Sequence, residues 1–389
     1  MIDYSKVLSQ RAVDLKPSGI RKFFDILDEM EDVISLTVGQ PDFVTPWHIR
    51  DEAIQSLEKG KTYYTSNSGL IAFREAISEY LERRFDVKYD PKSEMIVTVG
   101  GSEAIDLAIR AVIEPGDEVL IVEPSYVSYA PITELTGGVA VALPTRAEDK
   151  FKLTPEMLKQ HITPKTKMLV LPYPNNPTGA IMTREELQKI ADVLENTNIV
   201  VLTDEIYGEL TYGRKHASFA SIPSMWERTI YVGGFSKTYA MTGWRLGYVC
   251  APKELTKQML KIHQYCIMCA PTTAQYAGIQ AARAGDADIE YMRDQYDGRR
   301  KLLLKGLRDI GLECFEPEGA FYAFPNIGKY GLSSDEFCEK LLYDEHCAIV
   351  PGTAFGKSGE GFARISYAYS VDHICKALER LDAFLQKIK

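Results

Sequence analysis

The chain has 389 residues, of which 45% are hydrophobic and 25% are charged, and its formal net charge is −9. This composition is that of a globular protein of roughly two or three domains, and the acidic balance argues against nucleic-acid binding, which requires clustered Lys and Arg. Because the sequence contains no apolar run of about 18 residues and no signal-peptide pattern, we expect no membrane span and a cytoplasmic protein.

The seven cysteines are scattered along the chain, and their odd number favours reduced thiols over a disulfide framework. Cys266 and Cys269 form a C-x-x-C pair, but the sequence has no second pair to complete a zinc site. We therefore expect no metal centre, and we expect these two side chains to be packed in the interior.

The N-terminal part of the chain predicts an arm, a helix and a short strand. Residues 1–16 are mixed in charge and weakly patterned, as in an arm, and apolar residues at helical spacing predict a helix over 20–30. A short strand over 33–36 leads into the turn 39–43, where Gly39 permits a close approach between the backbone and a ligand.

Two helices with a polar loop between them come next. Thr45 and Pro46 predict the N-cap and the first residue of a helix that ends near Leu57. The loop contains Tyr64, and an amphipathic helix over 70–85 follows it.

From residue 95 onward, short apolar runs alternate with helical patterns. Each run is bounded by Gly, Asp or Pro and leads into a turn and a helix, which is the signature of a parallel sheet covered by helices. The predicted strands cover residues 95–99, 118–122, 167–171, 199–203, 229–232 and 247–249.

Four of these strands end in polar groups. Ligands of open α/β sheets bind at the carboxyl ends of the strands, so these groups are candidates for one site. They are the turn Gly100-Gly101-Ser102, the proline-rich loop 172–179, Asp204 and the stretch that contains Lys237.

The residues beyond 285 predict a smaller unit. The pattern over 286–310 indicates one long helix, and strands near 319–324, 348–350 and 362–366 precede a closing helix. We predict an N-terminal arm over 1–16, a large domain over 46–285, and a small α+β domain formed by 17–45 together with 286–389.

Lys237 is set among small residues, and Arg245 follows it in the same stretch. A lysine amine attacks a carbonyl only in its neutral form, so a functional Lys237 needs a pKa lowered by partial burial or by a nearby cation such as Arg245. The alternative for a single lysine is an exposed side chain in a surface loop.

The turn at Gly100 opens a helix and therefore offers unpaired backbone N–H groups to an anion. Its spacing matches neither the G-x-G-x-x-G of dinucleotide-binding proteins nor the G-x-x-x-x-G-K-[ST] of nucleotide-binding loops. Together with Ser236 and Arg245, the turn would surround a phosphate monoester. The cofactor that joins such a phosphate to an aldehyde for lysine is pyridoxal phosphate, and we expect it here.

Four further residues fit the ring of this cofactor. Asp204 suits the carboxylate beside the pyridine nitrogen, because an ionised aspartate keeps the ring protonated and able to accept electrons. Tyr207 and Asn176 would hydrogen-bond the phenolic oxygen, and Tyr126 would stack on the ring. Taken singly, Asp204 is better explained as a helix N-cap, Asn176 as a turn residue and Tyr126 as a core residue. Their joint arrival at successive strand ends favours the cofactor.

This set of motifs resembles that of the class I and II aminotransferases, which are pyridoxal-phosphate enzymes of fold type I. The similarity runs from about residue 18 to the C-terminus. The matching segments are Gly39-Gln40-Pro41-Asp42, Tyr64-Thr65, Gly100-Gly101-Ser102-Glu103-Ala104, Asn175-Asn176-Pro177-Thr178-Gly179, Asp204-Glu205-Ile206-Tyr207, Ser236-Lys237, Gly243-Trp244-Arg245 and Arg364.

The resemblance implies an α/β fold, with a mainly parallel seven-stranded sheet covered by helices in the large domain and a smaller α+β domain. It implies that Lys237 carries the cofactor and acts as the catalytic base and acid, assisted by Asp204 and Tyr207. The residues that it assigns to the cofactor are Tyr64, Gly101, Ser102, Glu103, Tyr126, Asn176, Asp204, Tyr207, Ser236, Lys237 and Arg245.

The resemblance also implies that Arg364 clamps the substrate α-carboxylate, with help from Asn176 and from the backbone at Gly39. Such a clamp is sensible because a guanidinium and a carboxylate match in a bidentate pair. Tyr64 would reach the phosphate of the neighbouring subunit, which implies a homodimer with shared active sites. Closed twofold dimers are also the commonest oligomers.

The substrate is less constrained than the reaction. Ser102 occupies a position where some prokaryotic members that act on aspartate carry a lysine, so a strict aspartate specificity is disfavoured. The segments 172–179, 263–265 and 319–322 resemble those of bacterial aromatic and N-acetyl-diaminopimelate aminotransferases. The resemblance implies an L-amino acid of the aromatic, aspartate or N-acetyl-diaminopimelate type as donor and 2-oxoglutarate as acceptor.

Two alternatives remain open at this point. A carbon–sulfur β-lyase on the same fold would use the same Lys237 and Asp204 but would eliminate at the β-carbon of its substrate. A pyridoxal-phosphate sensor that regulates transcription would need a basic DNA-binding domain, and this chain begins almost directly with the arm of the family.

Overall fold

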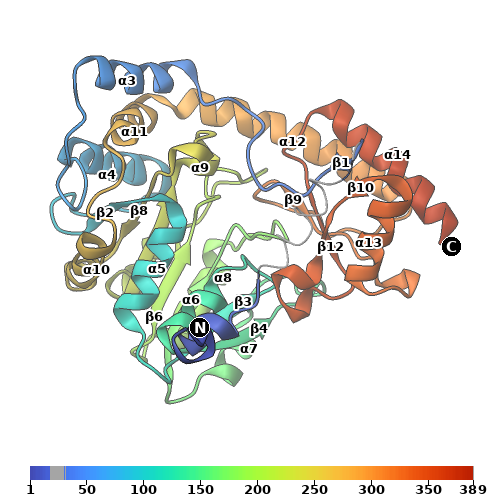
Figure 1. The fold of residues 1–389 in the computed structure, drawn as a ribbon, viewed down its shortest axis with the longest axis horizontal. Coiled ribbons are helices and arrows are strands. Elements are labelled where there is room, and N and C mark those ends of the chain that lie inside the picture. Colours follow the sequence, from blue (N-terminus) through green and yellow to red (C-terminus); the bar gives the residue numbers. More distant parts are fainter. Residues whose placement is uncertain (18–29, 31, 389) are drawn as a thin grey trace.

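The computed structural model describes residues 1–17, residue 30 and residues 32–388 (Figure 1). The helix predicted over 20–30 therefore lies outside the described residues, apart from Met30. The other predicted elements can be compared with the structure one by one.

The centre of the molecule is a seven-stranded sheet with the strand order β2-β8-β7-β6-β5-β3-β4. Six strands run in one direction, and β8 is antiparallel to both of its neighbours, β2 and β7. The strands are β2 (Met95–Thr98), β3 (Glu118–Glu123), β4 (Val139–Pro144), β5 (Thr166–Leu171), β6 (Val200–Asp204), β7 (Thr229–Gly234) and β8 (Gly247–Cys250). The predicted α/β fold with a mainly parallel seven-stranded sheet is confirmed.

One strand of this sheet, β4, has no counterpart among the six strands predicted from apolar runs. It pairs only with β3 within the described part of the chain and lies at the edge of the sheet. Most of its side chains are exposed or half-buried. An edge strand that faces solvent needs no continuous apolar run, which is why the pattern does not reveal it.

Helices cover both faces of the sheet because successive strand residues point to opposite sides. Val119 and Ile121 of β3 belong to one apolar core, whereas Leu120 and Val122 belong to another. The first face is covered by α5 (Gly100–Val112), α6 (Tyr129–Thr136) and α10 (Lys253–Cys266). The opposite face is covered by α4 (Ile71–Phe85), α7 (Pro155–His161), α8 (Arg184–Leu194) and α11 (Thr272–Ala284).

The helix predicted to start at Thr45 begins instead at Trp47, and Pro46 occupies the N-cap of α3 (Trp47–Glu58). Thr45 is buried, and its hydroxyl donates to the carbonyl of Ala240 at 2.6 Å and accepts from Trp244 Nε1 at 3.0 Å. The predicted capping role of Thr45 is therefore wrong. Its hydroxyl joins this segment to the loop that follows Lys237.

A second body lies at the other end of the molecule (Figure 1). Strand β1 (Ile34–Ser35) pairs in parallel with β10 (Cys347–Ala348). A three-stranded antiparallel sheet contains β11 (Val350–Pro351), β12 (Ala363–Ser366) and β9 (Tyr322–Ala323). Helices α13 (Ser334–Glu345) and α14 (Val371–Lys387) pack on these strands, so this body is the predicted smaller α+β unit.

The two bodies are joined by the long helix α12 (Asp286–Asp309), which runs along one side of the molecule (Figure 1). Near its start Ile289 packs into the core beneath the large sheet, whereas Met292, Tyr296 and Leu303 pack into the core of the smaller body. The domain limits given above remain a prediction, because this helix belongs to both cores.

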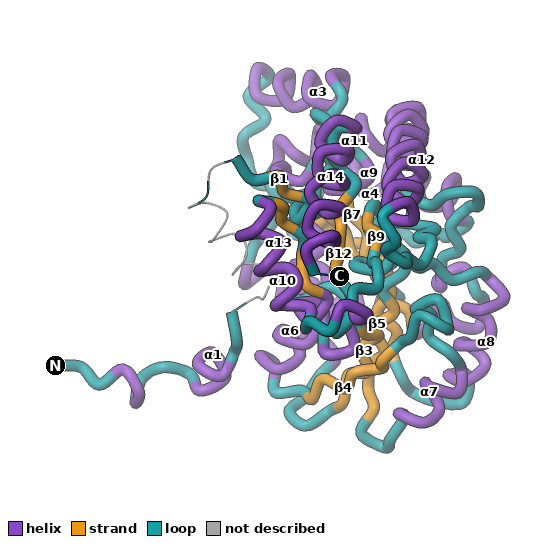
Figure 2. Tube along the Cα trace, turned by 90° about the vertical axis from the view of Figure 1, so that its right-hand side faces the viewer, coloured by secondary structure: helices purple, strands orange, loops and turns teal. Residues whose placement is uncertain are grey.

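The N-terminal arm extends away from the rest of the chain (Figure 2). It contains the short helices η1 (Tyr4–Lys6) and α1 (Gln10–Asp14), neither of which has a buried residue. Arg11 Nη1 donates to the carbonyl of Leu135 at 3.4 Å, which links the arm to α6. In the described ranges, no helix is both long enough and apolar enough to cross a membrane.

All seven cysteines are free thiols. Cys266 is exposed and Cys269 is half-buried, so the expected interior packing of this pair is wrong for Cys266. Cys266 is the last residue of α10, and Cys269 lies in the connection that follows the helix. Among the residues described, no group of His, Cys, Asp and Glu is arranged to hold a metal ion.

Candidate active site

A cavity of about 380 Å³ opens at the carboxyl ends of the parallel strands. It brings together residues from β6, from the turns after β2, β3, β5 and β7, and from β12 of the smaller body. Eleven of the residues selected from the sequence line it: Gly39, Gly101, Ser102, Tyr126, Asn176, Asp204, Tyr207, Ser236, Lys237, Arg245 and Arg364. Their roles are considered below.

Lys237 lies in the short helix α9 (Phe235–Thr238), directly after β7. A Cβ at Gly233 would overlap with the ring of Tyr248, so the glycine allows this ring to pack beneath the end of the strand. Lys237 Nζ donates to the carbonyl of Gly39 at 2.6 Å. Burial lowers the pKa of Lys237 to about 8, and the cations of Arg364 and Arg245 act in the same direction. Lys237 is therefore a much better nucleophile near neutral pH than an exposed lysine.

Asp204 is the last residue of β6, and its carboxylate is buried. It accepts hydrogen bonds from the hydroxyl of Tyr129 at 2.7 Å and from the backbone N–H of Ile206 at 3.2 Å. Burial raises the pKa of Asp204 to about 6, even though both hydrogen bonds favour the charged form. A buried carboxylate of this kind is stabilised by a cationic donor placed opposite it.

Tyr129 was not selected from the sequence. It is the first residue of α6, whereas Tyr126 lies three residues earlier in the connection before the helix, and both tyrosines line the cavity. Because Tyr126 precedes the helix, helical spacing between the two tyrosines gives no signal that would have identified Tyr129.

One end of the cavity is built for an anion. The N-cap of α5 is Val99, which gives no side-chain cap, so the first N–H groups of the helix stay available. Gly100 has φ of 76°, a conformation that favours glycine, and a Cβ on Gly101 would lie 2.9 Å from Ile206 Cδ1, so that side chain would have to shift. The Ser236 hydroxyl and the Arg245 guanidinium line the same cavity.

The other end of the cavity holds Arg364, which lies on β12 and is 3% exposed. Its Nη1 donates to Asn176 Oδ1 at 2.9 Å, its Nη2 donates to the carbonyl of Thr37, and its Nε has no partner. The guanidinium lies over the rings of Tyr322 and Phe355, at 4.5 and 4.7 Å from their centroids.

Arg364 is unusual because, among the described residues, it has no carboxylate partner. Burial lowers the pKa of Arg364 from its ordinary value, yet no carboxylate of the described residues forms an ion pair with it. A buried cation with an unpartnered N–H requires a compensating anion. The geometry therefore leaves a place for the carboxylate of a ligand.

Tyr207 and Tyr322 lie between these two ends, and their hydroxyls are 2.7 Å apart. Tyr207 follows β6, whereas Tyr322 comes from β9 of the smaller body. A Cβ on Gly39 would overlap with the Tyr322 hydroxyl, so Gly39 permits the contact between these segments. Tyr322 was not selected as a site residue, because its strand gave only an apolar pattern.

Two selected residues do not line the cavity. Glu103 turns away from it: its carboxylate accepts from the backbone N–H of Val99 and pairs with His263 of α10. The assignment of Glu103 to the cofactor remains a prediction, and its side chain is not among those that line the cavity. The reason is helical geometry, since Glu103 is rotated by about 100° from Ser102 around the axis of α5. Tyr64 is 79% exposed on the surface of the chain, and its role toward a neighbouring subunit remains a prediction.

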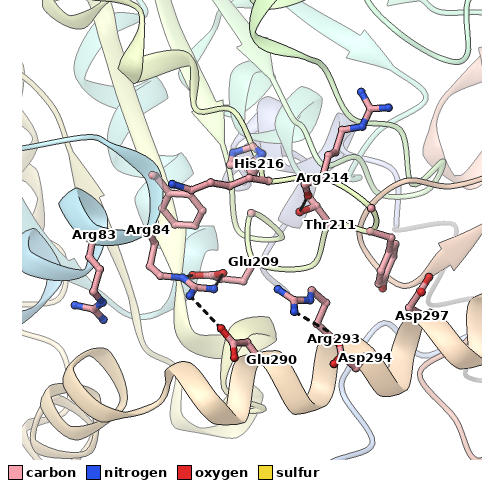
Figure 3. Close-up of a pocket in the computed structure, with 15 residues that line it drawn as sticks. Arg83, Arg84, Glu209, Thr211, Arg214, His216, Glu290, Arg293, Asp294 and Asp297 are labelled. Atoms are coloured by element: carbon pink, nitrogen blue, oxygen red, sulfur yellow. Dashed lines mark hydrogen bonds and ion pairs between the residues drawn. The ribbon is translucent and has the colours of Figure 1, made fainter.

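A larger cavity, of about 560 Å³, lies between the end of α4, the turn 208–216 and α12 (Figure 3). It is lined mainly by charged side chains that pair with one another. Arg84 forms ion pairs with Glu209 at 2.7 Å and with Glu290 at 3.7 Å, and Arg293 pairs with Asp294 at 3.3 Å. The charges of this larger cavity compensate each other. The lysine, the aspartate and the two arginines selected from the sequence all line the smaller cavity instead.

Comparison with known proteins identifies the relatives of this chain. Residues 31–381 match the family model described as aminotransferase class I and II. The putative aminotransferase YugH of Bacillus subtilis (strain 168) is 50% identical over 380 residues, which are 98% of each chain. The probable N-acetyl-LL-diaminopimelate aminotransferase of the same organism is 43% identical over 98% of this chain and 96% of its own. The crystal structure of the aromatic aminotransferase from Pyrococcus horikoshii OT3 has a TM-score of 0.90 and 44% identity, and covers 94% of this chain and 99% of that one.

Proposed function

The chain belongs to the class I and II aminotransferases, and we propose that it uses pyridoxal phosphate to move an amino group between an L-amino acid and a 2-oxo acid. The observation that carries this proposal is the arrangement of the three cations of the cavity. Arg245 lines the cavity beside Gly100 at the start of α5, Arg364 lines it from β12, and both cations act on Lys237. A cofactor phosphate and a substrate carboxylate would occupy the ends at Arg245 and Arg364, respectively.

The residues of the cavity fit this cofactor. The glycine turn at the start of α5, the Ser236 hydroxyl and Arg245 suit a phosphate, and the buried Asp204 suits a protonated ring nitrogen. When bound, pyridoxal phosphate supplies an aldehyde for a lysine amine and a ring that accepts electrons from the substrate α-carbon. Tyr126, Asn176 and Tyr207 line the same space and would contact the ring.

Lys237 has two tasks in this proposal. Its lowered pKa keeps a useful fraction of the amine neutral for attachment to the cofactor. When not attached to the cofactor, the amine of Lys237 would take the proton from the substrate α-carbon and would later deliver a proton during transfer of the amino group. The hydrogen bond to the carbonyl of Gly39 holds Nζ against the segment that carries Gly39 in the lining of the cavity.

Asp204 and Tyr129 act as a unit beneath the ring. The Tyr129 hydroxyl holds one carboxylate oxygen of Asp204 and leaves the aspartate oriented toward the cavity. The pKa of Asp204 is about 6, and a ring N–H placed opposite it would lower that pKa. Binding of the protonated ring and ionisation of Asp204 therefore support each other.

Arg364 would bind the substrate α-carboxylate, with Asn176 holding the guanidinium in place. Its unpartnered Nε and the absence of a carboxylate partner within the described residues support this role. The two relatives named above with a stated substrate act on an N-acetylated diamino acid and on aromatic amino acids.

For the amino donor we favour an aromatic amino acid over aspartate and N-acetyl-diaminopimelate. Lys237, Arg245 and Arg364 are the cations that line the cavity within the described part of this chain, and each already has a partner in the proposal. These cations would be shared by every amino donor, whereas Ile105, Tyr126 and Ile206 offer apolar surface that an aromatic side chain would cover. We propose 2-oxoglutarate as the acceptor, because it is the usual amino acceptor of the family.

We further propose a homodimer. Several large apolar side chains are exposed on the single chain, including Trp47, Tyr63, Tyr64 and Tyr265. Surfaces of this kind commonly mark protein interfaces. Sedimentation of the purified protein at several concentrations tests this, and a monomer at every concentration would contradict it.

A single-turnover screen of amino donors tests the function. The enzyme loaded with pyridoxal phosphate is mixed with phenylalanine, tyrosine, aspartate or N-acetyl-LL-diaminopimelate, and the conversion of the cofactor from its aldehyde to its amine form is followed by absorbance. We expect fastest conversion with an aromatic donor and reversal on addition of 2-oxoglutarate. Release of pyruvate and ammonia from cystathionine without any oxo acid would instead identify a carbon–sulfur β-lyase.

A further inference from the structure

A buried pair of side chains lies directly behind the anion-binding turn, outside the cavity. His263 of α10 is fully buried, and its Nδ1 lies 2.5 Å from Glu103 Oε1. The other ring nitrogen, Nε2, is buried without a partner. Because Glu103 is an acceptor, the geometry assigns the proton of His263 to Nδ1.

The second oxygen of Glu103 reaches the start of the helix. Glu103 Oε2 accepts from the backbone N–H of Val99, the N-cap residue of α5, at 2.5 Å. Arg245 Nη2 lies 3.5 Å from the carbonyl of the same residue. The peptide groups on both sides of Val99 are thus held, one by the buried pair and the other by a cation that lines the cavity.

This arrangement bears on how the first turn of α5 is fixed. Val99 has no side chain that can cap the helix, and the two glycines after it do not restrict their own backbone. Without Glu103, the N–H of Val99 would lack its only side-chain acceptor in the described structure. The hydrogen bond from His263 in turn fixes the rotamer of Glu103 and shares its negative charge.

We propose that His263 and Glu103 are positioning residues that hold the Val99-Gly100-Gly101 turn in the form that binds phosphate. This inference rests on the proposed function, because it concerns the affinity of the same cavity for the phosphate of its cofactor. Neither side chain touches the ligand. Their effect passes through the backbone of the turn and therefore falls on the phosphate end of the cavity, away from Arg364.

The test compares three full-length variants with the wild type. His263→Leu removes the donor to Glu103. His263→Asn keeps a donor, because its Nδ2 occupies the place of the histidine Nδ1. Met259→Ala is the matched control. Met259 is fully buried one turn earlier on the same helix, and its side chain forms no hydrogen bond with Glu103.

Each protein is freed of cofactor, and its affinity for inorganic phosphate is measured by calorimetry, together with its melting temperature. His263→Leu should bind phosphate about tenfold more weakly, as expected for loss of a hydrogen bond to a charged group. His263→Asn should restore the affinity to within about twofold, and Met259→Ala should lower the melting temperature with no loss of affinity. With cofactor restored at saturation, the KM of His263→Leu for the amino donor should stay within about twofold of the wild type.

The outcomes separate this inference from the proposed function. If the wild type binds phosphate and His263→Leu binds it equally well, the positioning role is wrong while the proposed function stands. Equal losses of affinity in His263→Leu and Met259→Ala also overturn the inference, because the pair would then contribute only packing. A wild type that binds neither phosphate nor pyridoxal phosphate overturns the proposed function itself, and the inference with it.

Discussion

The two ends of the cavity are built in different ways. At the phosphate end, the turn after β2 and the segment from β7 to Arg245 lie side by side, since β8 pairs with both β2 and β7. At the carboxylate end, Arg364 meets Asn176 and Thr37, which are 188 and 327 residues away in the sequence. The first end rests on one sheet, whereas the second exists only when the smaller body is docked.

The two ends also differ in the number of groups that would bind the ligand. At the end proposed to bind phosphate, several backbone N–H groups, a hydroxyl and a guanidinium would share the ligand, so no single donor would dominate. The carboxylate end depends on one buried guanidinium whose orientation is fixed by Asn176 and by two aromatic rings. We therefore expect graded losses at the first end and a severe loss at the second.

Removal of Lys237 should have the largest effect. Lys237→Ala should lower kcat by at least about 10⁴-fold, because both the attachment point and the proton carrier are lost. It should also abolish the absorbance band that the cofactor shows when joined to the lysine. Lys257→Ala, an exposed lysine on α10, is the control. Retention of both signals in Lys237→Ala would remove the central residue of the proposal.

Arg364→Leu tests the carboxylate end. The variant should lose about 10³-fold in kcat/KM, which corresponds to removal of one partner of a buried charge pair. Its affinity for pyridoxal phosphate should change little, because the phosphate end is left intact. Arg364→Lys should recover only part of the loss, since an ammonium cannot form the bidentate pair. Steady-state kinetics and a cofactor titration measure the two ends separately, and a matching loss of cofactor affinity would show that they are not independent.

Asp204 gives a prediction about stability and pH. Its pKa is about 6 in the folded protein without cofactor, against about 3.9 in an unfolded chain, so the folded state binds the proton more tightly. The free energy of unfolding should therefore fall by about 2 kcal/mol as pH rises from about 4 to 7, and then level off. Asp204→Asn should remove this part of the pH dependence while abolishing most activity. The free energy of unfolding of the cofactor-free wild type and of Asp204→Asn is measured with denaturant at a series of pH values. The same pH dependence in both proteins would contradict the raised pKa of Asp204.

Arg245→Met should have the smallest effect of the four, at the phosphate end. The backbone N–H groups of α5 and the Ser236 hydroxyl remain, so we expect cofactor affinity to fall by about tenfold. The KM for the amino donor, measured at saturating cofactor, should change far less. An effect as large as that of Arg364→Leu would show that the phosphate end also depends on a single group, and the contrast between the ends would disappear.

The sequence by itself determined the parts of this site that are local. Strands that end in Gly, Asp or a short helix can be recognised because periodicity and turn chemistry act over a few residues. This is how the anion-binding turn at Gly100, Asp204 at the end of β6 and Lys237 after β7 could be predicted, along with the parallel sheet that carries them.

Only the tertiary structure decided which side chains meet across the chain. Tyr322 reaches Tyr207 from the smaller body, and Tyr129 reaches Asp204 from a helix on one face of the sheet. Glu103 belongs to the correct motif, but the rotation of α5 directs its side chain to His263. Hydrophobic patterns and motifs report which residues lie near a strand end. They do not report the direction of a side chain or the docking of two bodies, because these depend on packing between segments far apart in the sequence.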